Sequence, residues 1–283
     1  MNDLNYWKER WNEVGKNYIL NKNTTKENIN IWNKSSKDYD ESVGNERIDE
    51  VIENLEKFGY INEDSIVLDL GCGTGVYSIA LSGICKNVDA LDYSDGMLEV
   101  LKEKIKSQGI DNINIIKDDW NSLDLKDNNM YKKYDFILCS LNPGCYSPDA
   151  LFKMNESSKG YCCYIGTDGM GNNNILDKCD YEILGKHVDK NDISNIIYPF
   201  NILYFNNYRP IVFYTHCNWI YKMDKEKAMS KLIKRYKKYI DIDEKIMDKL
   251  EYFVTDNLKN NMFIENSENN LGIVVWDVNK NKL

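Results

Sequence analysis

Short apolar runs alternate with helical stretches through the middle of the chain, between residues 66 and 165. Most of these runs lack a polar residue at every second position, as expected for strands that are covered on both faces. Alternation of such runs with helices predicts βαβ units and a parallel sheet. The predicted strands are 66–70, 88–91, 113–116, 136–140 and 161–165.

The segments on either side of this region have a mainly helical pattern. Residues 4–58 carry apolar side chains at helical spacing, with Trp7 and Trp11 four residues apart, before Gly59 ends the last helix. Further along, the pattern predicts a helix at 193–205, a strand at 210–220, two helices within 225–258 and a final strand at 272–278.

Together these elements predict an α/β fold with a doubly wound, mostly parallel seven-stranded sheet. We expect one continuous structure, because no internal repeat and no long Pro, Gly or Ser linker interrupts it. The expected parts are an N-terminal helical cap or lid at 1–60, an α/β core at 61–223, a helical insertion at 224–262 and the final strand of the core sheet at 263–283.

The chain is acidic, with a formal net charge of −9 and a pI near 5.0. Non-specific nucleic-acid binding depends on clustered Lys and Arg, so this charge opposes a nucleic-acid partner and favours a small-molecule substrate. The basic run at 231–238 has Leu232, Ile233 and Tyr236 at helical spacing. That spacing indicates the solvated face of an amphipathic helix rather than a nucleic-acid patch.

The sequence indicates neither a membrane partner nor export. No apolar run approaches the ~20 residues that cross a bilayer, and the polar, acidic start at residues 1–3 lacks the pattern of a secretory signal. The eight cysteines show no CxxC spacing, so we expect reduced, mostly buried thiols and no metal site. A cytoplasmic location is the expectation.

The strongest motif lies where the first predicted strand ends. Strand 66–70 runs directly into Gly71-Cys72-Gly73-Thr74-Gly75, and a predicted helix follows. Glycines are needed where the backbone turns sharply or approaches a ligand without an intervening Cβ. Asp92 then ends the next strand, where its carboxylate can accept hydrogen bonds from ribose hydroxyls.

This arrangement suits both dinucleotide binders and S-adenosylmethionine (SAM) binders. A dinucleotide fingerprint needs GxGxxG, and Val76 occupies the position of its third glycine. Residues 68–75, LDLGCGTG, instead resemble the first motif of class I SAM-dependent methyltransferases, with Asp69 as its acid. The resemblance extends from Trp32 to Ile165, and it implies a Rossmann-like core that binds SAM and releases S-adenosylhomocysteine.

The resemblance also implies a role for each matching motif. In that family, the acid that matches Asp92 holds the ribose, and the neighbours that match Tyr93 and Met97 cover the adenine. Tyr39 would close over the methionine end of SAM, Asp119 would lie near the adenine amino group, and the exit of the fourth strand would face the sulfonium. The implied cofactor-binding residues are Tyr39, Asp69, Gly71, Cys72, Gly73, Gly75, Asp92, Tyr93, Met97, Asp119, Trp120, Ser140 and Leu141.

The methyl acceptor is not identified by the sequence. Methyl transfer from a sulfonium needs mainly a nucleophile held in line with water excluded, so a general base is optional. Asn142-Pro143-Gly144-Cys145 resembles in part the NPP-aromatic motif that holds a nitrogen in some family members, or else it only shapes the loop. The candidate acceptor contacts are Trp11, Asn142 and Tyr146, and the candidate catalytic residue is His216.

The preferred function is SAM-dependent methylation of a small molecule, in a chamber formed by the N-terminal helices and the helical insertion. The segment through Tyr39 is expected to act as a lid that folding does not require. The alternatives are a methyltransferase acting on protein or RNA, and a non-catalytic SAM-binding module. A further alternative, methylation of a metalloid held by thiolates, draws on Cys72, Cys139 and Cys145. The sequence predicts no oligomeric state.

Overall fold

The computed structural model describes residues 3–17, 25–37, 39–42, 45–169, 171, 173–186 and 194–279. The chain divides into two compact units. The first unit comprises residues 1–169, 191–216 and 270–283, and the second comprises residues 170–190 and 217–269. Two strands, β6 (Ile211–Met223) and β8 (Met262–Asp277), contribute residues to both units.

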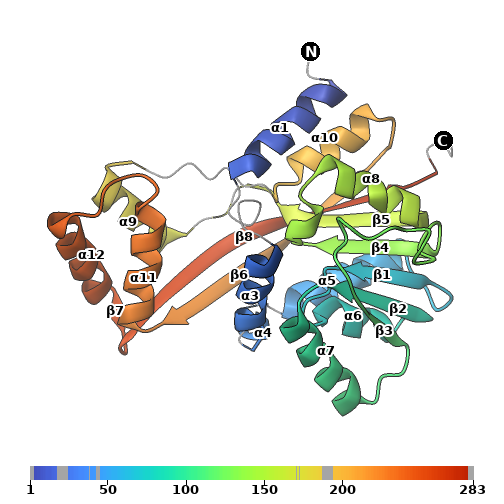
Figure 1. The fold of residues 1–283 in the computed structure, drawn as a ribbon, viewed down its shortest axis with the longest axis horizontal. Coiled ribbons are helices and arrows are strands. Elements are labelled where there is room, and N and C mark those ends of the chain that lie inside the picture. Colours follow the sequence, from blue (N-terminus) through green and yellow to red (C-terminus); the bar gives the residue numbers. More distant parts are fainter. Residues whose placement is uncertain are drawn as a thin grey trace. The chain divides into compact units, whose positions relative to one another are not determined.

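One sheet runs in the strand order β3-β2-β1-β4-β5-β8-β6, and the short strand β7 pairs with β8 (Figure 1). Neighbouring strands from β3 to β5 are parallel, whereas β8 is antiparallel to β5. The predicted fold class, a doubly wound and mostly parallel sheet with seven strands along one path, is confirmed. The other strands are β1 (Ile66–Leu70), β2 (Asn87–Asp92), β3 (Ile113–Lys117), β4 (Tyr134–Ser140), β5 (Ser158–Thr167) and β7 (Leu258–Lys259).

Strand β1 lies between β2 and β4 and is parallel to both. Every residue from Val67 to Leu70 is buried. Asp69 lies beside Ala90 of β2 on one side and Leu138 of β4 on the other. The carboxyl ends of β1, β2 and β4 therefore meet at one edge of the sheet.

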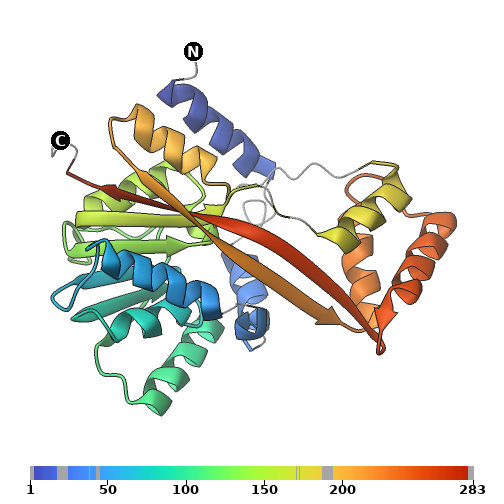
Figure 2. The ribbon, with the colours of Figure 1, turned by 180° about the vertical axis from the view of Figure 1, so that it is seen from behind.

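Helices cover both faces of this sheet in the first unit. Helices α5 and α6 lie on one face, and α1, α8 and α10 pack together on the other (Figures 1 and 2). This two-sided cover explains the nearly continuous apolar strands of the sequence. The helices are α1 (Leu4–Asn17), α3 (Thr25–Ser35), α4 (Tyr39–Ser42), α5 (Asn45–Lys57), α6 (Val76–Ser82), α7 (Asp95–Gln108), α8 (Pro148–Ser157) and α10 (Ile197–Phe205), with a 3₁₀ turn, η1 (Pro143–Cys145).

Helix α1 belongs to the hydrophobic core. Its apolar stripe includes Trp11, which is 0% exposed, and Val14. The Trp11 ring stacks on Tyr198 of α10 with a centroid distance of 6.0 Å, and it meets Tyr164 of β5 edge-on at 6.2 Å. The structure therefore corrects one expectation, because Trp11 is a fully buried core residue rather than an open contact for an acceptor. This packing favours α1 as a structural layer over a lid, and whether folding requires the helix stays a prediction.

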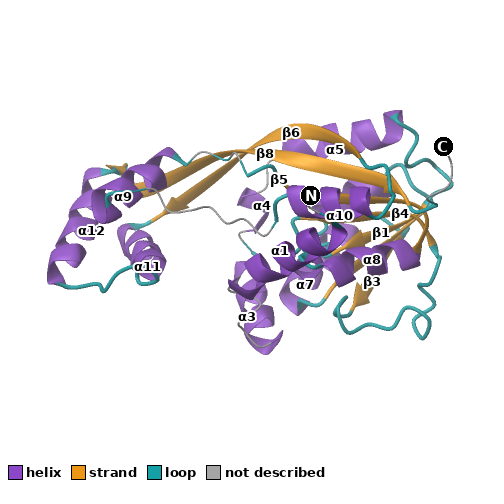
Figure 3. Ribbon diagram, turned by 90° about the horizontal axis from the view of Figure 1, so that it is seen from above, coloured by secondary structure: helices purple, strands orange, loops and turns teal. Residues whose placement is uncertain are grey.

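Within the described residues, the second unit contains three helices, the β7–β8 hairpin and the end of β6 (Figures 1 and 3). Its helices are α9 (Asn174–Leu184), α11 (Lys225–Tyr236) and α12 (Glu244–Asp256). The helices α11 and α12 fall within the predicted insertion between the last two long strands. Sequence patterns did not predict α9, which adds Leu176, Cys179 and Ile183 to the same small core.

Some basic residues of α11 form ion pairs within the second unit. Leu232 and Tyr236 are buried, which confirms an amphipathic helix. Arg235 donates to both oxygens of the buried Asp180, from Nε at 2.9 Å and Nη2 at 2.6 Å, and the Tyr236 hydroxyl donates to the same carboxylate at 2.8 Å. Lys231 pairs with Glu265. These charges therefore hold the unit together, which leaves fewer of them for an external anion.

The side chains of the eight cysteines are buried and unbridged. This confirms the prediction that they are residues of the interior. Among the helices of the described residues, none is long and apolar enough to cross a membrane.

Replacing the core tryptophan of α1 tests its structural role. We expect Trp11→Ala to lower the free energy of unfolding by about 3–5 kcal/mol, because it removes a fully buried aromatic side chain and leaves a cavity. Urea denaturation followed by circular dichroism measures the change. Tyr6→Ala on the same helix, where the side chain is 44% exposed, is the control and should cost under about 1 kcal/mol. Equally small effects for both would show that α1 is detachable.

Candidate active site

A cleft lies at the carboxyl ends of β1, β2 and β4, within the first unit. Residues of the glycine turn, of the first turn of α7 and of the β4 exit line it together with residues of α3 and α4. Open parallel sheets bind their ligands at this edge, where the strand order reverses. Most of the residues predicted to bind a cofactor are brought together here. The lining residues are Trp32, Tyr39, Gly71, Gly73, Asp92, Tyr93, Met97, Ser140, Leu141, Asn142 and Pro143.

The chain leaves β1 through the glycine turn, residues 71–75. The N–H groups of Gly71 and Cys72 both donate to the carbonyl oxygen of Leu91, at 2.8 and 3.0 Å, which ties the turn to β2. Gly71 has a φ of +75°, and a Cβ there would lie 2.3 Å from the side chain of Asn142. Glycine is therefore favoured at this position by both the backbone conformation and the close approach of the Asn142 side chain, which follows β4.

Asp92 ends β2 and holds two neighbouring backbone segments. Its Oδ2 accepts a hydrogen bond from the Gly73 N–H at 3.0 Å, and its Oδ1 accepts one from the Ser94 N–H at 2.8 Å. Burial raises the pKa of Asp92, and the Ser94 and Gly73 N–H groups oppose that rise. Each carboxylate oxygen can accept a further hydrogen bond. Asp92 can therefore hold the glycine turn and a ligand hydroxyl at the same time.

Asp69 lies in β1, two residues before Gly71 of the cleft lining. It is 2% exposed, and its Oδ2 accepts a hydrogen bond from the Ser78 hydroxyl at 2.5 Å. Burial raises the pKa of Asp69 to about 7; the Ser78 hydrogen bond lowers it, and the nearby Asp92 raises it. The carboxyl group therefore titrates near neutral pH.

Two polar contacts fasten α3 and α4 to the rim of the cleft. Asn33 of α3 accepts a hydrogen bond from the Gly96 N–H of α7 at 2.9 Å. Asp40 of α4 accepts one from the Thr74 hydroxyl at 2.5 Å and pairs with Lys104 at 2.5 Å. Each anchor is the chain neighbour of an aromatic residue that lines the cleft. Sequence reasoning missed both anchors, because a contact between distant polar residues leaves no periodic signal.

Arg47 of α5 is another residue that sequence reasoning missed. It is 6% exposed, and its Nε and Nη1 have no hydrogen-bond partner among the described residues. Burial raises the pKa of both Tyr39 and Tyr77, and the positive charge of Arg47 opposes the rise at each hydroxyl. Among the described residues, Arg47 is thus a buried cation with two unpartnered guanidinium nitrogens.

Asn142, the predicted acceptor contact, uses its side chain within its own loop. Its Nδ2 donates to the Leu70 carbonyl at 3.1 Å, and its Oδ1 accepts from the Gly144 N–H at 2.9 Å. These bonds join the exit of β4 to the end of β1. They favour the loop-shaping alternative for this motif, because both polar atoms of the amide are already engaged.

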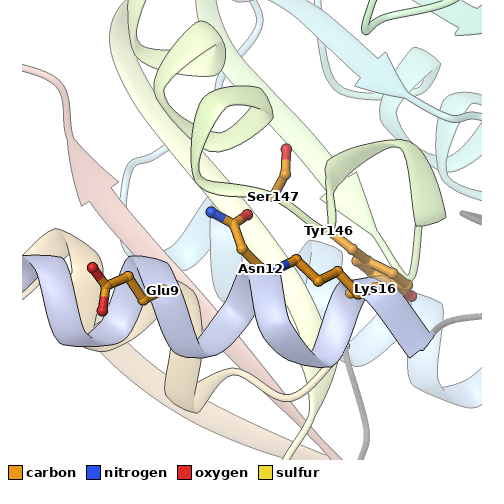
Figure 4. Close-up of a pocket in the computed structure, with 6 residues that line it drawn as sticks. Glu9, Asn12, Lys16, Tyr146 and Ser147 are labelled. Carbon is orange, nitrogen blue, oxygen red and sulfur yellow. The ribbon is translucent and has the colours of Figure 1, made fainter.

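A second cleft lies on the other side of the η1 turn. Residues of α1 and of the connection from η1 to α8 line it, and Figure 4 shows Asn12 and Lys16 facing the same space as Tyr146 and Ser147. Glu9 and Gly15 complete the lining. Tyr146, predicted to contact the acceptor, is therefore separated from Asn142 of the first cleft by one short turn.

The thiols near this edge of the sheet are buried rather than presented to a substrate. Burial raises the pKa of Cys72 and of Cys139 well above the usual range. The Cys72 Sγ contacts the Gly73 carbonyl at 3.7 Å, and Cys145 is also fully buried. Because the thiolate is the form that holds a metalloid, the structure opposes the metalloid alternative.

The remaining predicted residues lie outside both clefts. Trp120 is 2% exposed, and its indole N–H donates to the Ala150 carbonyl at 3.3 Å, so it is a core residue. Asp119 is half-buried and caps the loop that follows it. Gly75 is the N-cap of α6. His216 is exposed, with Nδ1 3.1 Å from Asn270 Oδ1, and it is not among the residues that line the two clefts. Its catalytic role stays a prediction.

Comparison with known proteins identifies the middle of the chain. Residues 67–156 match the family model described as a methyltransferase domain. A solved structure from Bacillus halodurans C-125, assigned as a methyltransferase, covers 80% of this chain and 98% of its own length, with a TM-score of 0.50 and 12% identity. At that identity the likeness shows the fold alone.

Two curated relatives each match less than half of this chain. A probable cobalt-precorrin-6B C(15)-methyltransferase (decarboxylating) of Methanocaldococcus jannaschii is 42% identical over 57 residues, 20% of this chain and 31% of the relative. A probable ribosomal RNA small subunit methyltransferase A of Methanosphaera stadtmanae is 26% identical over 131 residues, 46% of this chain and 44% of the relative. The chain thus spans less than half the length of either relative.

The buried Asp69 generates a prediction about stability and pH. Its pKa is raised from 3.8 to about 7 in the folded protein, so between these pH values the folded state binds more protons than the unfolded state. Its contribution to stability is therefore present at low pH and is lost as the pH rises through about 7. Asp69→Asn removes this loss. The variant should accordingly gain stability relative to the unsubstituted protein between about pH 4.5 and about pH 7.5.

Urea denaturation at several pH values measures this gain. Asp64→Asn, which changes an exposed acid close to β1, is the charge-matched control and should follow the unsubstituted protein. Parallel pH profiles for all three proteins would show that Asp69 is ionised throughout.

Proposed function

We propose that this chain, which belongs to the class I SAM-dependent methyltransferase family, transfers the methyl group of SAM to a small polar acceptor. One observation carries the proposal. The acid that ends β2, the glycine turn and the exit of β4 line a single cleft with two aromatic residues from the N-terminal helices. The acid suits the ribose of a nucleoside, the exit of β4 suits a sulfonium, and the two aromatic residues can cover the bound ligand.

The residues of the first cleft fit SAM as a cofactor. Asp92 keeps acceptor capacity for the ribose hydroxyls after binding its backbone partners. A Cβ at Gly73 would point toward the Met97 sulfur and the Tyr39 ring, both 3.9 Å away, so its absence leaves room between them. Tyr93 also lines this part of the cleft. We assign the ribose to Asp92 and the adenine to Tyr93 and Met97.

The chemistry needs little from the protein beyond placement. Bound SAM supplies a methyl group that is already electrophilic. The exit of β4, Ser140 to Asn142, is positioned by the Asn142 hydrogen bonds to β1 and to its own loop. Trp32 of α3 and Tyr39 of α4 line the same cleft. Their rings can exclude water from the reacting atoms. Because no histidine lines either cleft in the described residues, we assign no general base.

The second cleft is the favoured place for the acceptor. It begins one turn beyond the β4 exit, and its lining carries an acid, a base, an amide and two hydroxyls, in Glu9, Lys16, Asn12, Tyr146 and Ser147. Such a set suits a small molecule with both donor and acceptor groups. The net charge of −9 opposes an extended nucleic-acid contact.

The cofactor assignment predicts which nucleotides stabilise the fold. SAM and S-adenosylhomocysteine should raise the melting temperature at saturation, and NAD should not, because the turn lacks the third dinucleotide glycine. Differential scanning fluorimetry measures all three. Stabilisation by NAD alone would overturn the assignment.

Asp92→Ala should weaken S-adenosylhomocysteine binding by about 1.5–3 kcal/mol, the usual worth of hydrogen bonds to a charged group. Isothermal titration calorimetry gives the affinity. Asp95→Ala, three residues away and 56% exposed at its side chain, is the control and should bind as the unsubstituted protein does. Equal affinities for both variants would place the ribose elsewhere.

The acceptor class is tested with methyl-labelled SAM and cell extract separated into metabolites, protein and RNA. We expect label to enter the metabolite fraction. Label in RNA or protein would establish the macromolecular alternative instead. Binding of SAM with no label transferred to any fraction would favour a non-catalytic SAM-binding module.

A further inference from the structure

The sheet ends at an open edge strand. Among the described residues, the strand path ends at β6, which is hydrogen-bonded to β8 on one side (Figure 3). Residues 211–216 of β6 belong to the first unit. In an edge strand, every second residue directs its backbone N–H and C=O groups away from the sheet. These groups form a row of donors and acceptors that a further strand can complete.

The first part of β6 carries neither charge nor proline. Natural edge strands are commonly protected from unwanted pairing by charged side chains or by proline within the strand. Residues 211–216 contain neither, and Arg209 is the only Lys, Arg, Asp or Glu residue between positions 193 and 221. Because 29% of the whole chain is charged, this stretch is strongly depleted of charge. Depletion of charged residues is characteristic of the core of a protein interface.

Apolar side chains are exposed on both faces of the same strand. Ile211 is 57% exposed and Tyr214 is 58% exposed, and their odd and even positions direct them to opposite faces. The ring of the partly buried Phe213 lies 6.2 Å from the ring of Phe58, which is itself 57% exposed. Aromatic residues are enriched in the cores of interfaces. The edge therefore offers a partner both backbone hydrogen bonds and apolar area.

A second copy of the chain is the partner that fits this strand. Two identical strands can pair in antiparallel fashion about a two-fold axis, which closes the assembly at two chains. Each copy carries a net charge of −9, so two copies repel one another wherever their acidic surfaces meet. Residues 211–216 contain no acid. Two copies can therefore meet along this strand without opposing like charges on it.

We propose that the chain forms a two-fold dimer in which residues 211–216 of β6 pair antiparallel with the same residues of a second copy. Residues that lie opposite one another in an antiparallel pair share a face, so the axis passes beside a single residue. The centre of the strand places it at Phe213 or Tyr214. In either register the Tyr214 side chains of both copies lie on one face, directly opposite or one diagonal step apart. The dimer goes beyond the proposed function and does not depend on methyl transfer.

Sedimentation equilibrium measures the mass of the protein in solution as its concentration is varied. We expect a reversible dimer with a dissociation constant in the range of about 1–100 µM, because a short strand buries less than the ~800 Å² per partner of a stable interface. Added salt should strengthen the dimer, because it screens the repulsion between two acidic copies. One of the acids close to the edge is Glu50, which accepts a hydrogen bond from the Thr215 hydroxyl.

A pair of opposite substitutions tests whether the strand meets its own copy. Tyr214→Lys and Tyr214→Glu each bring like charges together across the axis, and each should raise the dissociation constant at least about 10-fold. A mixture of the two variants should restore dimers, because opposite charges then face one another. Tyr252→Lys and Tyr252→Glu change a residue of α12 that is 72% exposed. These matched controls should dimerise as the unsubstituted protein does, and circular dichroism verifies that every variant is folded.

Hydrogen exchange adds a measurement that needs no variant. The backbone amides of residues 211–216 should exchange more slowly at high protein concentration than at low concentration, because pairing protects them. A single-chain mass at every concentration would overturn the proposal. Dimers that persist in both Tyr214 variants, or that their mixture fails to restore, would do the same. Exchange of these amides that does not depend on concentration would show that any dimer forms through another surface.

Discussion

The packing of the glycine turn against the exits of β2 and β4 is the constraint on which the site depends. Gly71 has no Cβ, so Asn142 can lie against it and donate to Leu70 at the end of β1. On the other side, the turn donates two N–H groups to Leu91. The ends of β1, β2 and β4 are thereby fixed relative to one another by two backbone hydrogen bonds to β2 and one bond from the Asn142 side chain. Asp92 adds a side-chain link to the same turn through Gly73.

The N-terminal helices contact this edge by two different kinds of interaction. Helix α1 is held by buried aromatic rings, a large apolar contribution that does not depend on a ligand. Helices α3 and α4 meet the site through Asn33 and Asp40. The Asp40–Lys104 pair is partly exposed, at 40% and 23%, and partly exposed ion pairs contribute about 0–1 kcal/mol. The weaker attachment, that of α3 and α4, therefore lies at the rim of the first cleft. The stronger attachment, that of α1, lies in the hydrophobic core.

Local patterns were sufficient to predict much of the fold and of the first cleft. The strands β1 to β5 are short apolar runs, and the glycine turn needs no partner to be recognised in sequence. Most of the predicted cofactor residues follow a strand end directly, so topology alone brings them together. Residues such as Tyr93 and Met97 were found because they are close in sequence to the acid that ends β2.

The residues that were missed or misplaced depend on contacts between distant parts of the chain. Asn33 and Asp40 carry no local signature of their contacts, because each accepts a hydrogen bond from an element far along the sequence. Nothing in the local pattern marks Arg47 as a buried cation. Trp11 was misplaced for a related reason. An aromatic residue on an amphipathic helix suits a ligand chamber or a core equally well, and only the rings of α10 and β5 packed against it decide between them.

Charge connects these distant contacts to the chemistry of the cleft. Within the described residues, the first unit buries Asp69, a carboxyl group with a raised pKa, and Arg47, a guanidinium with two nitrogens that have no hydrogen-bond partner. Each is a buried ionisable group with too few partners of opposite charge. A ligand cation close to Asp69 would favour its ionised form, because an opposite charge lowers the pKa of a carboxyl group. Under the proposed function, methyl transfer removes one positive charge from the cofactor, so Asp92, the acid in the cleft lining, would attract the demethylated product less strongly than the methyl donor.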